Sequence, residues 1–229
     1  MVARKTEQVA IIEAPSIVQI IVPIKGTSPL VQHKFSKKAR EMMEAIVTTP
    51  KAAKKSKSAR EPRNFEEDFL GAQHISEEGW NGIPCAAFRA AMIDACRAAN
   101  VVMTRAKMSV FVLPDGVDKD EGTPLVRLRS PKPPEQHHGL VRLESGAADV
   151  RVRPMWRDWS AEVKIEYDED MITAQSVINL MERAGRQIGI QEGRPFSKNS
   201  CGQGWGTFRV VESLQGSDSI EGVSKKKKK

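Results

Sequence analysis

The chain has 229 residues, of which 40% are hydrophobic, so it can bury a core and is not disordered throughout. Its 36 Lys and Arg against 29 Asp and Glu give a formal net charge of +7. No apolar run approaches the roughly 20 residues that cross a bilayer, and residues 1–16 lack the apolar segment of a secretory signal. We therefore expect neither a membrane protein nor a secreted one.

The positive charge favours a polyanionic partner, nucleic acid first, because phosphate contacts release counterions. A basic protein without such a partner is the alternative that charge alone leaves open. The cysteines Cys85, Cys96 and Cys201 show no CxxC spacing, which indicates a reduced, cytoplasmic compartment rather than a zinc site. We interpret the adjacent His137 and His138 as loop residues, and we expect no metal and no cofactor.

The first part of the chain predicts a strand, a helix and a basic loop. The β-branched run IVQIIVPI at 17–24 is typical of a buried strand, with Pro23 at an edge. Ser36 can cap a helix that runs to about Glu44. Residues 48–63 contain four lysines, two arginines, one acid and no large apolar side chain. They form either a solvated insertion or an arm that orders on nucleic acid.

The middle of the chain predicts a helix, a strand and a projecting hairpin. Apolar side chains recur every three or four residues across 84–99, which predicts an amphipathic helix. The run MSVFVL at 108–113 predicts a strand that ends at a Pro-Asp-Gly turn. LVRLR at 125–129 and LVRLE at 140–144 alternate in character, so we expect them to pair as a hairpin with 130–139 at its tip.

The last part predicts a strand, a helix and a final strand. WSAEVKIEY at 159–167 alternates strictly, which is typical of a strand with one buried and one wet face. Thr173 is a good cap for a helix that runs to 188, and GTFRVVE at 206–212 follows as a strand. The polar residues 213–229 end in five lysines and are expected to form a flexible basic tail.

In chain order the elements run β-α-β-β-α-β, which predicts an α+β, ferredoxin-like core with both helices on one face of an antiparallel sheet. We expect one domain over residues 1–212, with a basic insertion at 48–66 and a hairpin insertion, or thumb, at 115–149. An RNA-recognition motif shares this order but stacks bases on aromatic side chains of a central strand. The wet face of 159–167 carries Ser, Glu, Lys and Glu instead, so we expect the ligand to bind elsewhere.

The segment GIQEGRPFSKNSCGQGWGTFRV at 189–210 is the main candidate for a ligand loop. Gly202, Gly204 and Gly206 allow backbone amides to approach a phosphate, and Trp205 offers a face to a base. The cations of the segment are Arg194, Lys198 and Arg209. It is not a Walker P-loop, because GxxxxGK[ST] is absent. A glycine-rich turn with Trp205 packed beneath it is the alternative.

A glycine-rich loop between the second helix and the last strand of such a domain resembles the RAMP superfamily, the repeat-associated RNA-binding proteins of CRISPR systems. The phrase IPCAAFRAAMIDACR at 83–97 is similar to the opening of the first helix in that superfamily. The hairpin at 115–149 is similar in position to the thumb of CRISPR effector backbone subunits. The resemblance implies subunits that assemble side by side along a single strand.

The chain also resembles, over 17–212, a family of bacteriophage proteins without an assigned function. The segments that carry this resemblance are GTSPLVQHKFSKKARE at 26–41, GIPCAAFRAAM at 82–92, AADVRVRPMWRDWSAEVKIEY at 147–167, GIQEGRP at 189–195 and GQGWGTFRV at 202–210. This resemblance implies a phage-encoded protein in the cytoplasm of a bacterial host.

We therefore expect a non-catalytic protein that binds single-stranded DNA or RNA and forms a homo-oligomeric filament, in phage DNA replication or recombination or in an RNA-guided complex. One alternative is a RAMP-type endoribonuclease that uses His33; another is a protein-interaction module that mimics a CRISPR backbone subunit. Trp156 is a further candidate for stacking. The expected nucleic-acid contacts are Lys25, His33, Lys34, Phe35, Lys37, Lys38, Arg40, Lys54, Lys55, Lys57, Arg127, Arg129, Arg194, Lys198, Gly202, Gly204 and Trp205.

Overall fold

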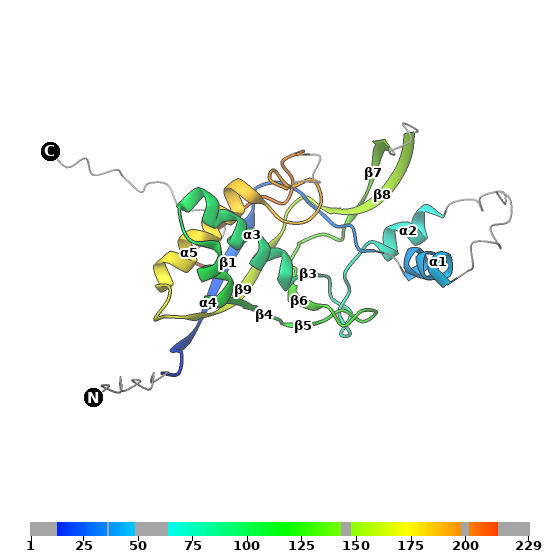
Figure 1. Cartoon of the computed structure of the whole chain (residues 1–229). Helices are drawn as coiled ribbons and strands as arrows, with labels where there is room; N and C mark the ends of the chain where they lie inside the picture. The colour runs from blue at the N-terminus through cyan, green and yellow to red at the C-terminus, as the bar shows by residue number, and fades with distance from the viewer. Residues whose placement is uncertain (1–12, 36, 49–63, 143–147, 198–201, 215–229) are drawn as a thin grey trace, which may run out of the picture.

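The computed structural model describes residues 13–35, 37–48, 64–142, 148–197 and 202–214 (Figure 1). The expected α+β class is confirmed, since antiparallel sheets and helices make up the chain. The strands are β1 (Ile17–Gly26), β2 (Leu30–Val31), β3 (Gly82–Pro84), β4 (Val110–Leu113), β5 (Gly116–Val117), β6 (Pro124–Arg127), β7 (Glu135–Arg142), β8 (Ala148–Trp156), β9 (Ser160–Asp168) and β10 (Phe208–Val210). The helices are α1 (Lys37–Thr48), α2 (Phe65–Gly71), α3 (Cys85–Ala99), α4 (Met103–Ser109) and α5 (Ala174–Arg183), with a π-helical turn at Ala184–Ile188.

The largest sheet has four antiparallel strands in the order β10-β1-β9-β4. Its central pair, β1 and β9, is the pair of strands that the hydrophobic patterns predict most clearly. Alternate side chains of a strand point to one face, and accordingly Val22 and Ile24 of β1 and Val163 and Ile165 of β9 are all buried. The predicted wet face of β9 is only partly covered.

Helices α3 and α5 pack on the buried face of this sheet (Figure 1). Phe88 and Met92 of α3 meet Val177 and Met181 of α5 in one core, in agreement with the apolar stripe of each predicted helix. Thr173 caps α5 as expected, because its hydroxyl accepts from the Ser176 amide at 3.3 Å.

Two smaller sheets extend from the core. Strands β2, β8 and β7 form one, and strands β3, β6 and β5 form the other, each in that order. Helix α2 packs against β8. Figure 1 shows the β7–β8 ribbon projecting from the end of the molecule opposite α4 and α5. The ribbon is therefore placed well away from the helical face.

The predicted hairpin of 125–129 with 140–144 is wrong. Strand β6 pairs with β3 and β5, and it is β7 that forms a hairpin, with β8. Both Leu125 and Val126 are buried, because β6 is covered on both faces and its local pattern does not report a single wet side. The residues between β7 and β8 lie outside the described part of the chain.

Three other expectations need correction. His137 and His138 are not loop residues but belong to β7. Trp156 is 2% exposed and therefore cannot stack a base. The predicted strand at 108–113 begins only at Val110, because the preceding residues close the short helix α4.

Candidate nucleic-acid interface

The β7–β8 ribbon carries a histidine and two arginines on one face. Its register sets His137 opposite Arg153 and Gly139 opposite Arg151. Residues two apart along a strand point the same way, so these four positions share a face of the ribbon. Because Gly139 has no side chain, the side chain of its cross-strand partner Arg151 is the only one at this pair of positions. We call this the cationic face of the ribbon.

The other face of the ribbon is apolar. His138 pairs with Val152, and Leu140 pairs with Val150. The ring of Phe65 in α2 lies against His138, with centroids 6.0 Å apart. Leu140 is 72% exposed and Val150 is 40% exposed. The ribbon is thus amphipathic, and much of its apolar rung at Leu140 and Val150 is open to solvent.

The glycine-rich loop meets the cationic face through Trp205. The indole lies edge-on to His137, with ring centroids 5.0 Å apart and planes at 85°. Its backbone amide donates to the Gly193 carbonyl at 3.1 Å. The same ring covers Gly193, where a Cβ atom would fall 2.5 Å from the indole. Trp205 is therefore half-buried, with His137 and Gly193 against its ring.

Backbone hydrogen bonds fix this loop to the segment that follows β1. The Gly206 amide donates to Pro29 at 2.8 Å, and the Glu192 amide donates to Val31 at 3.1 Å. Gly206 has φ +66°, and a Cβ there would lie 1.9 Å from the Ile190 carbonyl oxygen, so only glycine fits. The last strand of the core and β2 thus hold the loop in position beside the ribbon.

The outer glycines of the loop face open space. Gly202 and Gly204 have φ values of +64° and +79°, and no atom lies within 4 Å of a Cβ at either position. Their backbone conformation therefore requires glycine or a residue that tolerates positive φ, while packing places no limit on them. They remain candidates for close approach by a ligand.

An ion cluster joins the loop to the ribbon. Glu192 accepts from Arg153 at 3.3 Å, and its other oxygen lies 3.8 Å from Nδ1 of His33. Burial lowers the pKa of His33, as does the nearby Arg153, while Glu192 opposes the shift. Burial likewise lowers the pKa of His137, helped by Arg153. Because their pKa values are lowered, both imidazoles stay neutral to a lower pH than an ordinary histidine does, and both lie near the positive charge of Arg153.

Two carboxylates at the margins temper the positive charge of the ribbon. Asp149 lies 3.5 Å from Arg151 within β8, and Glu135 lies 2.8 Å from Arg157 just beyond it. Both pairs are solvent-accessible, and such pairs are worth little because water and salt screen them. A phosphate group can therefore compete for these guanidinium groups, which bind phosphate oxygens in a bidentate manner.

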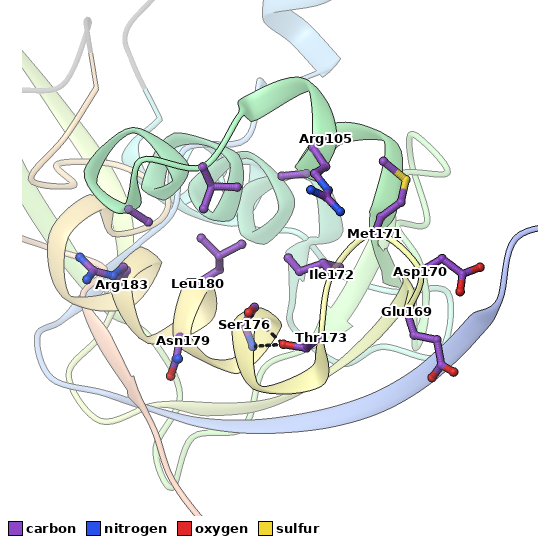
Figure 2. A pocket seen from close by; sticks show the side chains of 13 residues that line it. Arg105, Glu169, Asp170, Met171, Ile172, Thr173, Ser176, Asn179, Leu180 and Arg183 are labelled. Carbon is purple, nitrogen blue, oxygen red and sulfur yellow. Dashed lines mark hydrogen bonds between the residues drawn. The ribbon is translucent and has the colours of Figure 1, made fainter.

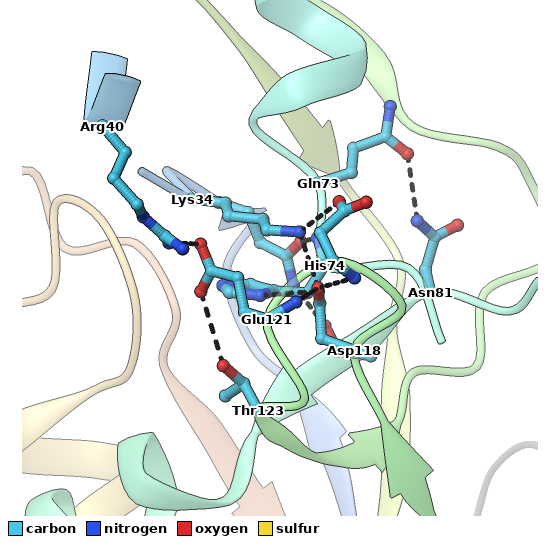
Figure 3. Close-up of polar contacts among 11 residues, drawn as sticks. Lys34, Arg40, Gln73, His74, Asn81, Asp118, Glu121 and Thr123 are labelled. Carbon is cyan, nitrogen blue, oxygen red and sulfur yellow. Dashed lines mark hydrogen bonds and ion pairs between the residues drawn. The ribbon is translucent and has the colours of Figure 1, made fainter. Parts of the chain in front are cut away.

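The sequence predicts that Lys34 lies in an exposed basic segment, and this prediction is wrong. Lys34 is only 5% exposed (Figure 3). Its ammonium donates to Asp118 and to Asp120, both at 2.7 Å, and Asp118 also contacts His74 at 3.3 Å. Burial alone would lower the pKa of Lys34, but the hydrogen bonds to Asp118 and Asp120 outweigh it and raise the pKa. Lys34 is therefore a structural ion, committed to the turn after β5.

Arg40 contributes to the same region. Its guanidinium donates to Glu121, which in turn accepts from Thr123 (Figure 3). This contact connects α1 to the β5–β6 turn, so Arg40 has an internal partner although its side chain is partly exposed.

The other described candidates are scattered. Lys25 is exposed on β1, beside Arg209 of β10, and Phe35 is 44% exposed. Arg127 lies over the Trp80 ring at 5.7 Å, and Arg129 pairs with Glu162 at 2.6 Å on the open face of the sheet.

Arg194 turns back to its own loop. Its guanidinium donates to the Ser197 hydroxyl at 3.0 Å and to the Gln191 carbonyl at 3.3 Å. The side chains of Lys37 and Lys38 in α1 are not described, and Lys54, Lys55, Lys57 and Lys198 lie outside the described residues, as does most of the basic insertion.

Sequence reasoning missed His137, Arg151, Arg153 and Glu192. The alternation VRVRP at 150–154 does place both arginines on one side of a strand, and this signal is available in the sequence. What it lacks is the partner strand, because β7 is hidden in a stretch rich in Pro and His.

Comparisons with known proteins add no family. Neither the protein-family models nor the curated proteins give a match to this sequence. Among the described residues, no group of three or more His, Cys, Asp or Glu side chains is arranged to hold a metal ion. Nor does any helix in that part of the chain have the length and apolar character to span a membrane.

Proposed function

We propose that this protein binds single-stranded nucleic acid, without cleaving it, along the cationic face of the β7–β8 ribbon and the adjoining glycine-rich loop. The observation that carries the proposal is the contact of Trp205 with His137, beside Arg153. It puts an aromatic ring, a titratable imidazole and guanidinium groups in one patch. Aromatic rings stack bases and arginines bind phosphates, and these are the two components of single-strand binding.

A single strand fits this surface better than a duplex does. The half-buried Trp205 ring can stack only on a base that is not paired and stacked within a helix. Arg151, in the space above Gly139, lies one rung further along the ribbon, where it can follow a flexible backbone. We therefore expect a base at Trp205 and phosphates along His137 and Arg151, while Arg153, which is only 6% exposed and is paired with Glu192, adds positive charge from a buried position.

We further propose that the four-stranded sheet with α3 and α5 is a ferredoxin-like core of the RAMP type, in a phage-encoded protein. The proposal is supported by the chain order β1, α3, β4, β9, α5, β10 and the strand order β10-β1-β9-β4. In this proposal the β7–β8 ribbon takes the place of the thumb, and the glycine-rich loop lies between the second helix and the last strand.

Assembly of subunits side by side along the strand is part of the proposal. The support for it is the exposed rung of Leu140 and Val150, on the face of the ribbon that points away from the cationic face. An exposed apolar pair on a projecting element is typical of a contact surface. Binding of one subunit would then favour binding of the next.

Fluorescence anisotropy with labelled single strands and the corresponding duplexes tests the proposal. We expect single-stranded DNA or RNA to bind with an affinity that falls steeply with salt, and to displace duplex of equal length. We expect the labelled DNA and the labelled RNA strands both to remain uncleaved after incubation with the protein. Equal binding of duplex would contradict the choice of ligand, and cleavage that depends on His33 would contradict the non-catalytic role.

A further inference from the structure

A cavity lies between the helices at the end of the molecule opposite the ribbon (Figure 2). Its volume is about 510 Å³, within the range of small-molecule sites. One wall comes from the end of α3 and from α4, and the other comes from α5 and the turn before it. The cavity is separate from the proposed nucleic-acid interface, and the two sites have no residue in common.

The apolar lining of the cavity is aliphatic. Ala106 and Leu180 are almost completely buried at its base, and Val101 and Ile172 flank them. No aromatic side chain is present among the described residues that line it. A nucleobase or another flat ring would find no stacking partner here, so the body of a ligand that fits this wall is a hydrocarbon chain.

Two arginines line the cavity, Arg105 from α4 and Arg183 from α5 (Figure 2). Within the described residues neither guanidinium forms an ion pair, whereas Arg129, Arg153 and Arg157 each do. Figure 2 shows the Arg105 side chain directed toward Ile172. Both arginines are solvent-exposed, and a guanidinium that forms no ion pair with the protein beside an aliphatic wall is open to an anionic head group.

The acids of the cavity orient such a ligand. Glu169 and Asp170 lie at the end away from Arg183 in Figure 2, and Asp170 accepts from the Ser16 amide at 3.3 Å. They repel an anion from that end. The first turn of α5, by contrast, has no acidic side chain. Arg105 lies between these acids and Arg183 in Figure 2, so the charge distribution favours a head group on the Arg183 side of Arg105 and a chain along Ile172 and Leu180.

We infer that this cavity binds a small aliphatic carboxylate, with its carboxylate group on Arg105 and its hydrocarbon chain against Ile172 and Leu180. Arg183 adds attraction from the adjacent turn of α5. A planar carboxylate matches the fork of a guanidinium, and the alkyl chain is itself removed from water against the aliphatic lining.

Isothermal titration of the full chain with octanoate tests the inference, with octanol and octylammonium as ligands of the same chain length. Arg105→Met keeps the length and helix propensity of the side chain but removes its charge. Lys107→Met, on the same helix but outside the cavity, is the matched control. We expect octanoate to bind at least about tenfold more tightly than octanol, octylammonium not to bind, and Arg105→Met to lose about tenfold, as a charge-assisted hydrogen bond implies.

Thermal unfolding of each variant checks that the fold is retained. Octanoate that fails to bind, or that binds no better than octanol, would overturn the inference. Equal affinities of Arg105→Met and Lys107→Met for octanoate would overturn it as well, since any attraction would then come from overall charge. Neither result would bear on the ribbon and its nucleic-acid ligand.

Discussion

Trp205 lies edge-on to His137, with ring centroids 5.0 Å apart, and this contact joins the glycine-rich loop to the β7–β8 ribbon. One ring comes from the connection between α5 and β10, and the other comes from the middle of β7. Their contact converts two separate candidate surfaces into one, with Arg153 on the same face of the ribbon. The proposed function depends on this geometry.

Replacement of Trp205 by alanine should weaken single-strand binding by about ten- to a hundredfold. Base–aromatic stacking is worth ~1–3 kcal/mol per base. Because Trp205 is half-buried, the variant should lose less stability than the ~3–5 kcal/mol of a fully buried aromatic. Anisotropy with a labelled strand, together with urea unfolding, measures both effects.

Phe111→Ala is the matched control for that substitution. Phe111 is an exposed ring on β4, 40% accessible, with the Arg89 guanidinium 5.2 Å from its centroid. It therefore reproduces an aromatic side chain next to a cation outside the interface. Equal losses of affinity in the two variants would argue against a specific stacking site at Trp205.

The core could be predicted from the sequence because its signals are local. The alternation along β9 and the apolar stripes of α3 and α5 each lie within one element, and the structure follows them. The pairing of β7 with β8 could not be predicted in this way. It depends on which strands lie side by side in the fold. In the same way, nothing in the local sequence around Leu125 and Val126 indicates that β6 pairs with β3 and β5.

The site could be predicted only in part for the same reason. Glycines and Trp205 mark the loop as a ligand candidate, but the burial of Lys34 depends on Asp118, 84 positions away in the chain. In the sequence Lys34 has the same basic surroundings as an exposed lysine. Only the fold separates a structural cation from those that face solvent.

Affinity for single strands should rise as the pH falls. The pKa values of His33 and His137 are lowered by burial and by Arg153, so both imidazoles are neutral at pH 7 in the free protein. A bound phosphate favours the protonated ring, and binding therefore takes up protons as the pH falls below the ordinary value of 6.5. Anisotropy from pH 8 down to about pH 5.5 measures this slope.

His137→Gln should flatten that dependence while leaving a folded protein, since glutamine is polar and never charged. The substitution of His138, which faces α2 on the other side of the ribbon, is the control. If affinity does not vary with pH, or if both variants keep the slope of the unchanged protein, the imidazole of His137 does not contact phosphate.

The stability of the free protein should have the opposite pH dependence. The folded-state pKa values of His33, His74 and His137 all lie below 6.5, and burial is the main cause in each. Their contribution is complete above pH 6.5 and is lost as the pH falls through the folded values, because the unfolded chain binds the protons first. Urea midpoints at pH 7.5 and about pH 5.5 should therefore differ, with the lower midpoint in acid.

Lys34→Met should destabilise the protein by about 3–5 kcal/mol, because it leaves the Asp118 carboxylate buried without its cation. Lys25→Met, at an exposed position of β1, should cost far less. At temperatures where Lys34→Met is folded, its affinity for a single strand should match that of Lys25→Met. A stable Lys34→Met variant with weakened binding would mean that Lys34 contacts the ligand.

The inner Gly206 and the outer Gly204 of the loop should differ in their tolerance of alanine. At Gly206 a Cβ would overlap the Ile190 carbonyl oxygen at 1.9 Å, and the loop must shift away from Pro29. At Gly204 only the positive φ is unfavourable, at roughly 1–2 kcal/mol for an L-residue. Gly206→Ala should therefore lose both stability and binding, because Trp205 moves with its neighbour.

Gly204→Asn separates conformation from contact at the outer position. Asparagine tolerates positive φ, so this variant should regain most of the stability lost in Gly204→Ala. A folded Gly204→Asn variant that binds single strands less well would place the ligand against the loop backbone, because a Cβ atom at this position meets no protein atom within 4 Å. Full affinity in that variant would restrict the interface to Trp205 and the ribbon, with the glycines serving only to make the turn.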